Sequence, residues 1–383
     1  YFEGGIADLA IYNRAISAAE VTSMQTIQKA STVYSDPATS KCPTQVSNPN
    51  NVTVTSVGTD CVVKFSAPSN TTTSNSWIVP SNVTAARVLV VGGGGGGGAH
   101  VGAGAGAGGM IEKTTSLVPS ASVPITAGAG GAGSYRLGTA STVAGSIGAN
   151  STFNNVFTAL GGGAGSNWDV AVTRSAGSGG GGTSYGGTQT AIGVANDPTQ
   201  GNNGGNDPDN CGSTYSYPTG GGGGAGGVGG NASCTTYSTG KAGNGGIGKQ
   251  SNITGSNLYY AGGGGGGVHV NGSYTGFGGL GGLGGGGNSA SWNDGGVPGT
   301  CANATATASN GTDGLGGGGG GAGAPGSATC NSYGGRGGSG VVIVRYGQTT
   351  VTLNTNGGSG FTGNTSMTAS SYSYLALPLI FCL

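Results

Sequence analysis

The chain passes from an apolar run into glycine at residues 87–98, which read Arg-Val-Leu-Val-Val-Gly-Gly-Gly-Gly-Gly-Gly-Gly. Of its 92 glycines, 3 precede residue 92 and 5 follow residue 340, so the 249 residues between hold 84. That share is the collagen level, but strict every-third spacing is absent and proline numbers only 13. Aromatic residues and cysteines also interrupt the glycine runs, whereas flexible Gly/Ser linkers lack them.

Glycine at this density indicates backbones that approach closely, because glycine is otherwise a costly choice for ordered structure. A polyproline II helix has three residues per turn and no internal hydrogen bonds, so its polar backbone groups can pair with neighbouring helices. Leu280 and Leu283 stand three residues apart with glycines between them, as do Arg336 and Ser339. This period predicts a bundle of roughly ten polyproline II helices. Residues 102–108 differ, since their Gly-Ala alternation with period two would suit a strand.

Apolar segments rich in β-branched residues predict about seven half-buried strands. These segments are 62–65, 77–79, 87–91, 110–114, 122–126, 153–160 and 341–346, with a possible further strand at 52–57. The fold class expected is therefore mainly β plus polyproline II, with little α-helix.

The charge pattern argues against several partners. The chain has 12 Lys+Arg against 12 Asp+Glu, and only 6% of its residues are charged. No basic excess points to nucleic acid or an anionic membrane. No apolar run approaches the ~20 residues of a spanning helix, so we expect no membrane insertion. Low charge with much Gly, Asn, Ser and Thr would also suit disorder, although the periodic runs favour order.

Seven cysteines are present, and six of them form neighbouring pairs in sequence. The expected disulfides are Cys42 with Cys61, Cys211 with Cys234 and Cys301 with Cys330, which leaves Cys382 over. Six cysteines allow fifteen pairings, so the connectivity is a hypothesis from proximity. Disulfides would place the chain in an oxidising, extracellular compartment. Because the chain starts without Met and stops inside a pattern, we interpret it as a piece of a larger protein.

Few residues suggest chemistry. Residues 88–98 satisfy the dinucleotide glycine fingerprint, but no helix formers follow, so we expect no cofactor. His100 and His269 each lie two residues beyond a glycine run and could meet at one bundle end, as a metal or pH-sensitive site or as solvated tips. Residues 206–210 are rich in oxygen ligands, yet a polar turn fits their spacing better than a Ca²⁺ loop. We expect no metal site and no catalytic centre.

The aromatic residues between glycine runs are the candidate binding residues. They would either cap the ends of a bundle that has no apolar core or form a recognition surface. They are Trp168, Tyr185, Tyr215, Tyr217, Tyr237, Tyr259, Tyr260, Tyr274 and Trp292.

Several of these segments resemble a known family. Residues 77–80 (Trp-Ile-Val-Pro), 88–94, 125–133, 151–163 and 339–346 are similar to landmarks of the bacterial and phage glycine-rich domain family. A related region occurs in receptors of the anaplastic lymphoma kinase type. The resemblance spans roughly 62–346 and implies a small jelly-roll-like β-sandwich that carries a polyproline II bundle, without catalysis.

The flanking segments carry two shorter resemblances. Residues 5–20 resemble the C-terminal end of a laminin-G/concanavalin-like domain, and 350–360 resemble the start of an internalin-B-type bacterial repeat. The expected organisation is a laminin-G-like remnant at 1–30, a linker and strand segment at 31–61, the glycine-rich domain at 62–346 and a partial repeat at 347–383.

These observations predict a non-enzymatic, extracellular, adhesin-type surface module. Its partner would be a surface glycan or protein receptor, with self-association in a surface assembly also open. The alternatives are an architectural spacer of a surface layer or stalk, and an accessory module of a larger secreted enzyme.

Overall fold

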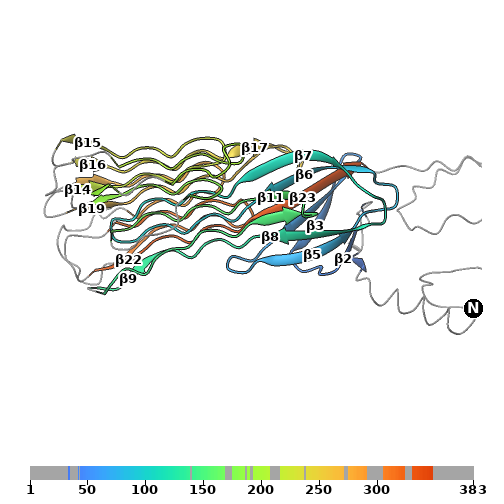
Figure 1. The fold of residues 1–383 in the computed structure, drawn as a ribbon, viewed down its shortest axis with the longest axis horizontal. Helices are drawn as coiled ribbons and strands as arrows, with labels where there is room; N and C mark the ends of the chain where they lie inside the picture. The colour runs from blue at the N-terminus through green and yellow to red at the C-terminus, as the bar shows by residue number, and fades with distance from the viewer. Residues whose placement is uncertain are drawn as a thin grey trace, which may run out of the picture.

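The computed structural model describes the glycine-rich region in two parts that lie end to end, a β-sandwich and a long glycine bundle (Figure 1). The flanking predictions at 1–30 and 348–383 fall outside its described residues. The residues described are 33–34, 42, 44–138, 140–168, 175–185, 188–189, 193–207, 216–236, 239–270, 275–290, 305–323 and 330–347.

The sandwich consists of two antiparallel sheets. The five-stranded sheet has the order β3 (Val52–Val57), β4 (Asp60–Ser66), β23 (Val341–Gly347), β6 (Ala85–Val91), β7 (Met110–Ser116). The six-stranded sheet has the order β1 (Val33–Tyr34), β2 (Thr44–Val46), β5 (Thr73–Ile78), β8 (Ser122–Ala127), β10 (Ser151–Phe153), β11 (Phe157–Ala159). The chain crosses between the two sheets after β2, β4, β5 and β7. The predicted mainly β fold is confirmed, since the described residues contain no helix.

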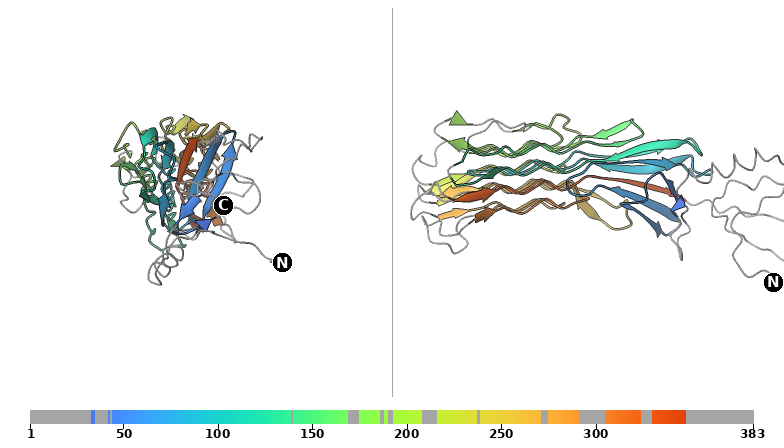
Figure 2. Two further views of the ribbon diagram at one scale, coloured as in Figure 1. Left: turned by 90° about the vertical axis from the view of Figure 1, so that its right-hand side faces the viewer. Right: turned by 90° about the horizontal axis from the view of Figure 1, so that it is seen from below.

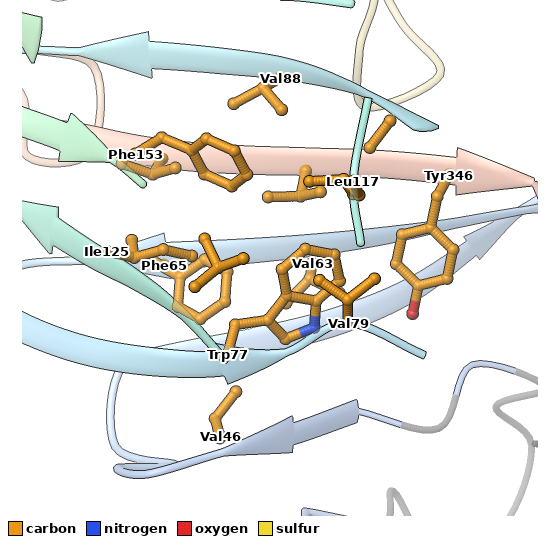
Figure 3. Close-up of a cluster of buried hydrophobic side chains, with 14 of the residues drawn as sticks. Val46, Val63, Phe65, Trp77, Val79, Val88, Leu117, Ile125, Phe153 and Tyr346 are labelled. Atoms are coloured by element: carbon orange, nitrogen blue, oxygen red, sulfur yellow. The ribbon is translucent and has the colours of Figure 1, made fainter. Parts of the chain in front are cut away.

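The apolar core lies between the two sheets (Figure 3). Trp77 and Ile125 from the six-stranded sheet meet Val63 and Phe65 from the five-stranded sheet, and all four side chains are buried. Tyr346 packs beside Trp77 with ring centroids 5.8 Å apart, and burial raises the pKa of Tyr346 to about 12. Alternation along each strand directs these side chains inward.

The two central strands depart from the half-buried prediction, because both of their faces are covered. Val88 and Val90 of β6 face the six-stranded sheet, whereas Leu89 and Val91 face a second apolar cluster. That cluster includes Ile253, Tyr260 and Ala261 from the hairpin of β17 (Lys249–Ser251) and β18 (Leu258–Tyr260), which folds over the outer face. A strand that is buried on both faces has a continuous apolar sequence. Residues 341–344 of β23, all of them buried, show this pattern too.

The segment 153–160 is a hairpin and not the single strand that its apolar residues predicted. β10 and β11 pair antiparallel across Asn154 and Asn155, which both have φ of +52°. Asparagine tolerates this left-handed conformation, so two adjacent asparagines permit a tight turn inside an apolar segment.

The glycine bundle is built from polyproline II helices, as the hydrogen bonds of residues 92–98 demonstrate. Every third amide of this run donates to the same neighbour, in rotation to residues 103–109, 146–149 and 335–338. Its carbonyl oxygens accept, with the same rotation, from three further runs at 131–134, 162–165 and 319–322. A period of three is that of the polyproline II helix. The run is therefore surrounded by six others, with its hydrogen bonds directed between runs.

Residues 102–109 follow the same rule, so the strand suggested by their Gly-Ala alternation is wrong. Their amides donate in turn to runs near residues 316–322, 160–166 and 220–223, again with period three. Ala103, Ala105 and Ala107 are all 0% exposed. The methyl groups are small enough to be buried between runs, so the sequence period of two does not set the backbone period.

Glycine is required where two runs touch. A Cβ on Gly95 would lie 2.1 Å from the carbonyl oxygen of Gly163, and one on Gly97 would lie 2.0 Å from that of Gly320. Neither distance is compatible with a carbon–oxygen contact, and both obstacles are backbone atoms. The runs in contact are near 92–98, 102–109, 128–134, 145–149, 160–166, 177–182, 200–206, 219–226, 228–231, 242–248, 260–267, 279–283, 284–290, 308–312, 316–323 and 334–340, which exceeds the roughly ten expected.

Asparagine side chains complete the hydrogen bonding at exposed runs. The Oδ1 atom of Asn244 accepts from the amide of Leu280 at 2.9 Å, and that of Asn288 accepts from Gly281 at 2.8 Å. Asn310 accepts from the amide of Arg336 in the same way, at 2.8 Å. Each side-chain oxygen accepts the hydrogen bond that the backbone carbonyl of a further run would otherwise accept, which explains the abundance of asparagine beside the glycine runs.

One predicted disulfide lies wholly within the described residues. Cys42 and Cys61 are bonded with a Cα–Cα distance of 5.4 Å, which ties the start of the sandwich to β4. Cys234 and Cys330 are each disulfide-bonded to another cysteine as well. Cys211, Cys301 and Cys382 lie outside the described residues, so the other two pairings remain predictions.

Asp313 ties the base of the bundle to the loop after β4. Its carboxylate accepts hydrogen bonds from Arg336 Nη1 at 2.9 Å, from Ser69 Oγ at 2.6 Å and from the Ser339 amide at 2.8 Å. Burial alone raises the pKa of Asp313, but the hydrogen bonds outweigh it and hold this pKa below its usual value.

Gly281→Ala should lower the free energy of unfolding by roughly 3 kcal/mol or more, because its methyl would overlap backbone. The added Cβ would lie 2.1 Å from the carbonyl oxygen of Gly286. The matched control is Gly227→Ala, whose Cβ would lie 3.2 Å from the Ile247 side chain and 3.7 Å from the nearest backbone atom. Chemical denaturation of both variants measures the difference, and equal stabilities would contradict the close-packing argument.

Asp313→Asn should destabilise the chain at pH 7 and have little effect near pH 2. A carboxylate whose folded pKa is depressed stabilises the fold above its unfolded pKa of about 4 and loses that contribution as the pH falls through the folded value. Thermal unfolding of wild type and variant across this range tests the sign. An equal loss at both pH values would show that Asp313 acts through packing.

Peptide mapping without reduction should recover Cys211 linked to Cys234 and Cys301 linked to Cys330. Each pair would close a loop of 20 to 30 residues, which contributes ~3 kcal/mol in the chain-entropy description. A cross-linked peptide that joins the two pairs, such as Cys234 with Cys330, would contradict this connectivity.

Candidate functional site

The tip of the bundle, at the end away from the sandwich, gathers short strand pairs and the turns between runs (Figures 1 and 2). The strands labelled there in Figure 1 are β9 (Tyr135–Arg136), β14 (Ser216–Pro218), β15 (Ser233–Thr236), β16 (Thr239–Lys241), β19 (Val268–Val270) and β22 (Asn331–Tyr333). Figure 2 shows the bundle between this tip and the sandwich as stacked layers of extended backbone.

Four rings from distant parts of the sequence meet at the tip, and we call them the tip ring cluster. His100 lies in the turn between two runs, Trp168 follows the run at 160–167, and Tyr217 and His269 face each other across the β14–β19 pair. The ring centroids of His100 and His269 are 5.8 Å apart, and His100 lies 5.4 Å from Trp168. Tyr217 lies 5.9 Å from Trp168 and 5.6 Å from His269. The prediction that the two histidines could meet is therefore confirmed.

Arg136 places a guanidinium against this cluster. Its Nη1 atom contacts both ring nitrogens of His100, and it can donate only to one that carries no proton. Arg136 Nε is buried and has no hydrogen-bond partner in the described part of the chain. The site thus holds a permanent cation with one donor unused.

The turn that presents His100 is strained. His100 has φ of +51° and Val101 has φ of +63°, although a β-branched residue rarely adopts a positive φ. The amide of His100 donates to Ser332 Oγ at 3.0 Å, and Ser332 Oγ donates in turn to the Gly323 carbonyl at 3.1 Å. Each such residue costs on the order of 1–3 kcal/mol, and strain of this kind gathers at functional sites.

A second pair of rings lies beside the cluster. Tyr135 of β9 and Tyr333 of β22 are direct partners in the strand pair, with stacked rings whose centroids are 6.4 Å apart. Tyr135, Tyr333 and Arg136 are not among the candidate residues expected from the sequence. All three adjoin glycine runs, so the criterion that selected the other aromatics would have found the two tyrosines.

Two of the remaining aromatic candidates lie at the opposite end of the bundle from the tip ring cluster. Tyr259 and Tyr260 belong to β18, at the sandwich end, where Tyr260 is only 2% exposed and caps the outer face of the five-stranded sheet. Burial also raises the pKa of Tyr260 above its usual value. The backbone of Tyr185 lies in β12 (Ser184–Tyr185), paired with β13 (Thr188–Gln189). The other candidates, Tyr215, Tyr237, Tyr274 and Trp292, lie outside the described residues.

The described residues show no group of three or more His, Cys, Asp or Glu side chains that could hold a metal ion. The glycine fingerprint at 88–98 leads into a turn and a second polyproline II run, so the helix that would hold a pyrophosphate is missing there. An acid within hydrogen-bond reach of His100 or His269 would indicate catalysis, and Asp169, Asp294 and Asp313 are the acids to consider. Asp313 pairs instead with Arg336 at the sandwich end. Asp169 and Asp294 lie outside the described residues.

A search for membrane spans within the described residues finds no helix with the required length and hydropathy.

Comparison with known proteins agrees with this architecture. The family model described as "Glycine-rich domain" matches residues 69–347. No curated protein matches the chain. The matched residues make up well over half of the 383, and they contain both the bundle and most strands of the sandwich. The chain therefore belongs to the glycine-rich domain family.

Proposed function

We propose that this chain is a non-enzymatic binding module of an extracellular surface protein, and that the tip of its glycine bundle is the recognition surface. The observation that carries the proposal is the tip ring cluster. His100, Trp168, Tyr217 and His269 come from four separate segments, yet they converge at the end of the bundle farthest from the sandwich.

The bundle suits the task of holding such a surface. Each run is fixed by backbone hydrogen bonds to several neighbours, so the turns at the tip emerge from a rigid base. Tyrosine, tryptophan and histidine combine an apolar ring with a polar atom, and such side chains are favoured in contact surfaces. The strain at His100 and Val101 supports a functional role for this turn, since a purely structural turn would be more stable with glycine.

The extracellular location rests on the cysteines. A disulfide joins Cys42 to Cys61. Cys234 and Cys330 each form a further disulfide with another cysteine. Structural disulfides are typical of oxidising compartments. The resemblance of residues 5–20 to a laminin-G-like domain and of 350–360 to an internalin-B-type repeat would fit a bacterial adhesin. The alternatives are an architectural spacer and an accessory module of a secreted enzyme.

Binding of the full chain to a printed array of neutral and acidic glycans tests the proposal. Trp168→Ala and Tyr217→Ala should each weaken the binding at least tenfold, or ~1.4 kcal/mol, because they remove rings from the surface. The matched control is Tyr259→Ala, at the sandwich end, which should bind as wild type does. Loss of binding in the control alone, or no binding to any glycan or to bacterial and host cells, would favour a spacer.

His100→Gly separates function from stability. Glycine adopts a positive φ without steric cost, so we expect the free energy of unfolding to stay the same or rise by ~1 kcal/mol. The same change removes a ring from the tip ring cluster, so the binding should weaken. Thermal unfolding and the array assay measure the two effects. A clear loss of stability with unchanged binding would instead assign His100 a structural role.

A further inference from the structure

We infer that one flank of the glycine bundle is a contact surface for a second copy of this chain. The flank consists of the neighbouring runs at 228–231, 242–248 and 279–283, and we call its exposed apolar residues the flank patch. They are Val228, Ile247, Leu280 and Leu283, which are 65%, 50%, 62% and 61% exposed. This surface is separate from the tip, so the inference does not depend on the proposed recognition function.

The patch is continuous because the three runs lie side by side. The central run at 242–248 joins β16 at the tip to β17 at the sandwich end (Figure 1). On one side, the carbonyl oxygen of Ile247 accepts from the Gly226 amide at 3.0 Å. On the other side, the Gly248 amide donates to the carbonyl oxygen of Leu283 at 2.7 Å. These pairings place the four apolar side chains within about one polyproline II turn of each other along the bundle, ~9 Å.

The patch has gaps that match its own side chains. Two glycines separate Leu280 from Leu283, and a polyproline II helix places such positions ~9 Å apart. The first of these glycines, Gly281, is partly exposed, and Gly226 on the opposite run is exposed. Each gap is a slot beside an apolar side chain, so side chains of one copy can enter the slots of another. A surface that complements itself in this way is what a two-fold interface requires.

The absence of charge from the patch favours a second copy over a charged partner. In a two-fold interface, a residue near the axis faces its own counterpart, so a charged residue there would meet a like charge. None of the four residues is charged, and the exposed Lys241 and Lys249 lie beyond the two ends of the central run. The chain has 12 Lys+Arg against 12 Asp+Glu, so no net charge opposes the association of two copies.

The size of the patch predicts a weak dimer. Contiguous exposed apolar patches of a few hundred Å² often mark contact surfaces, whereas a standard stable interface buries ~800 Å² on each partner. Four partly exposed side chains supply less than that area. The runs are already fixed by backbone hydrogen bonds, so little conformational entropy is lost when the two flanks meet. We expect a dissociation constant of roughly 10–500 μM.

Sedimentation equilibrium of the full chain at concentrations from ~5 μM to ~1 mM measures the association. A dimer should form at the upper end, and raising the salt from ~50 mM to ~500 mM should not weaken it, because an apolar contact is not screened. An isologous contact closes at two copies. A monomer at every concentration, a dimer that salt dissociates, or growth beyond two copies would overturn the inference.

Ile247→Glu should weaken the dimer at least tenfold, because it places two like charges across the interface. The matched control is Val118→Glu, which changes a 70% exposed valine in the sandwich, between β7 and β8. This control should associate as wild type does. Both side chains are exposed, so thermal unfolding should remain as in wild type. Equal weakening in the two variants, or none in Ile247→Glu, would overturn the inference.

A mixture of Ile247→Glu and Ile247→Lys distinguishes a second copy from any other occupant. Each variant alone should stay monomeric, whereas the mixture should form a dimer with one copy of each, since opposite charges then face each other. A mixture that stays monomeric would overturn the two-fold arrangement. If the Ile247 variants fail to fold, Leu280→Ser, in an exposed position of the same patch, should weaken the wild-type dimer. An unchanged dimer in that variant would likewise overturn the inference.

Discussion

The hydrogen bond between the backbones of neighbouring glycine runs is the interaction on which this structure depends. It forms only where no Cβ stands between the runs, since a Cβ at Gly95 or Gly97 would fall about 2 Å from a carbonyl oxygen. Ordering one residue costs ~1–2 kcal/mol of backbone entropy, and one net hydrogen bond returns ~0.5–1.5 kcal/mol. For a bundle without a side-chain core, the entropy cost and the hydrogen-bond gain therefore nearly cancel, and the free energy of folding is close to zero.

The sandwich provides what the bundle lacks. Strand β6 ends at Val91 and continues directly into the run at 92–98, while the run at 334–340 leads directly into β23. Val91 pairs with Met110 in the sheet, and the next amide, Gly92, already donates to Gly109 in the bundle. The register of the five-stranded sheet thus sets the register of the first runs. The buried core around Trp77 and the disulfide at Cys42 supply side-chain and covalent stabilisation that the runs cannot.

Because the sandwich supplies the side-chain core, the residues at the tip of the bundle are not limited to a structural role. The inner positions of the runs accept glycine or alanine and little else, whereas the turns between runs have no such restriction. Large rings therefore collect at the two ends of the bundle. At the sandwich end Tyr260 is buried and closes the base, and at the tip Trp168 and Tyr217 remain partly exposed. The same compositional rule thus produces a structural residue at one end and a candidate contact surface at the other.

The sequence by itself determined the fold class, because its signals are local. The period of three in the glycine runs and the apolar segments at 87–91 and 341–346 indicate polyproline II helices and strands without reference to neighbours. Local signals gave a wrong prediction where one sequence pattern is compatible with two structures. The Gly-Ala alternation at 102–108 suits a strand, and only the surrounding runs impose period three on it. The apolar segment 153–160 hides a turn at two asparagines. The positions of His100 and His269 after glycine runs made their meeting possible, although they are 169 positions apart. Only the tertiary structure decided that they meet and that Arg136 lies beside them, because the runs that carry them become neighbours through hydrogen bonds that no local pattern records.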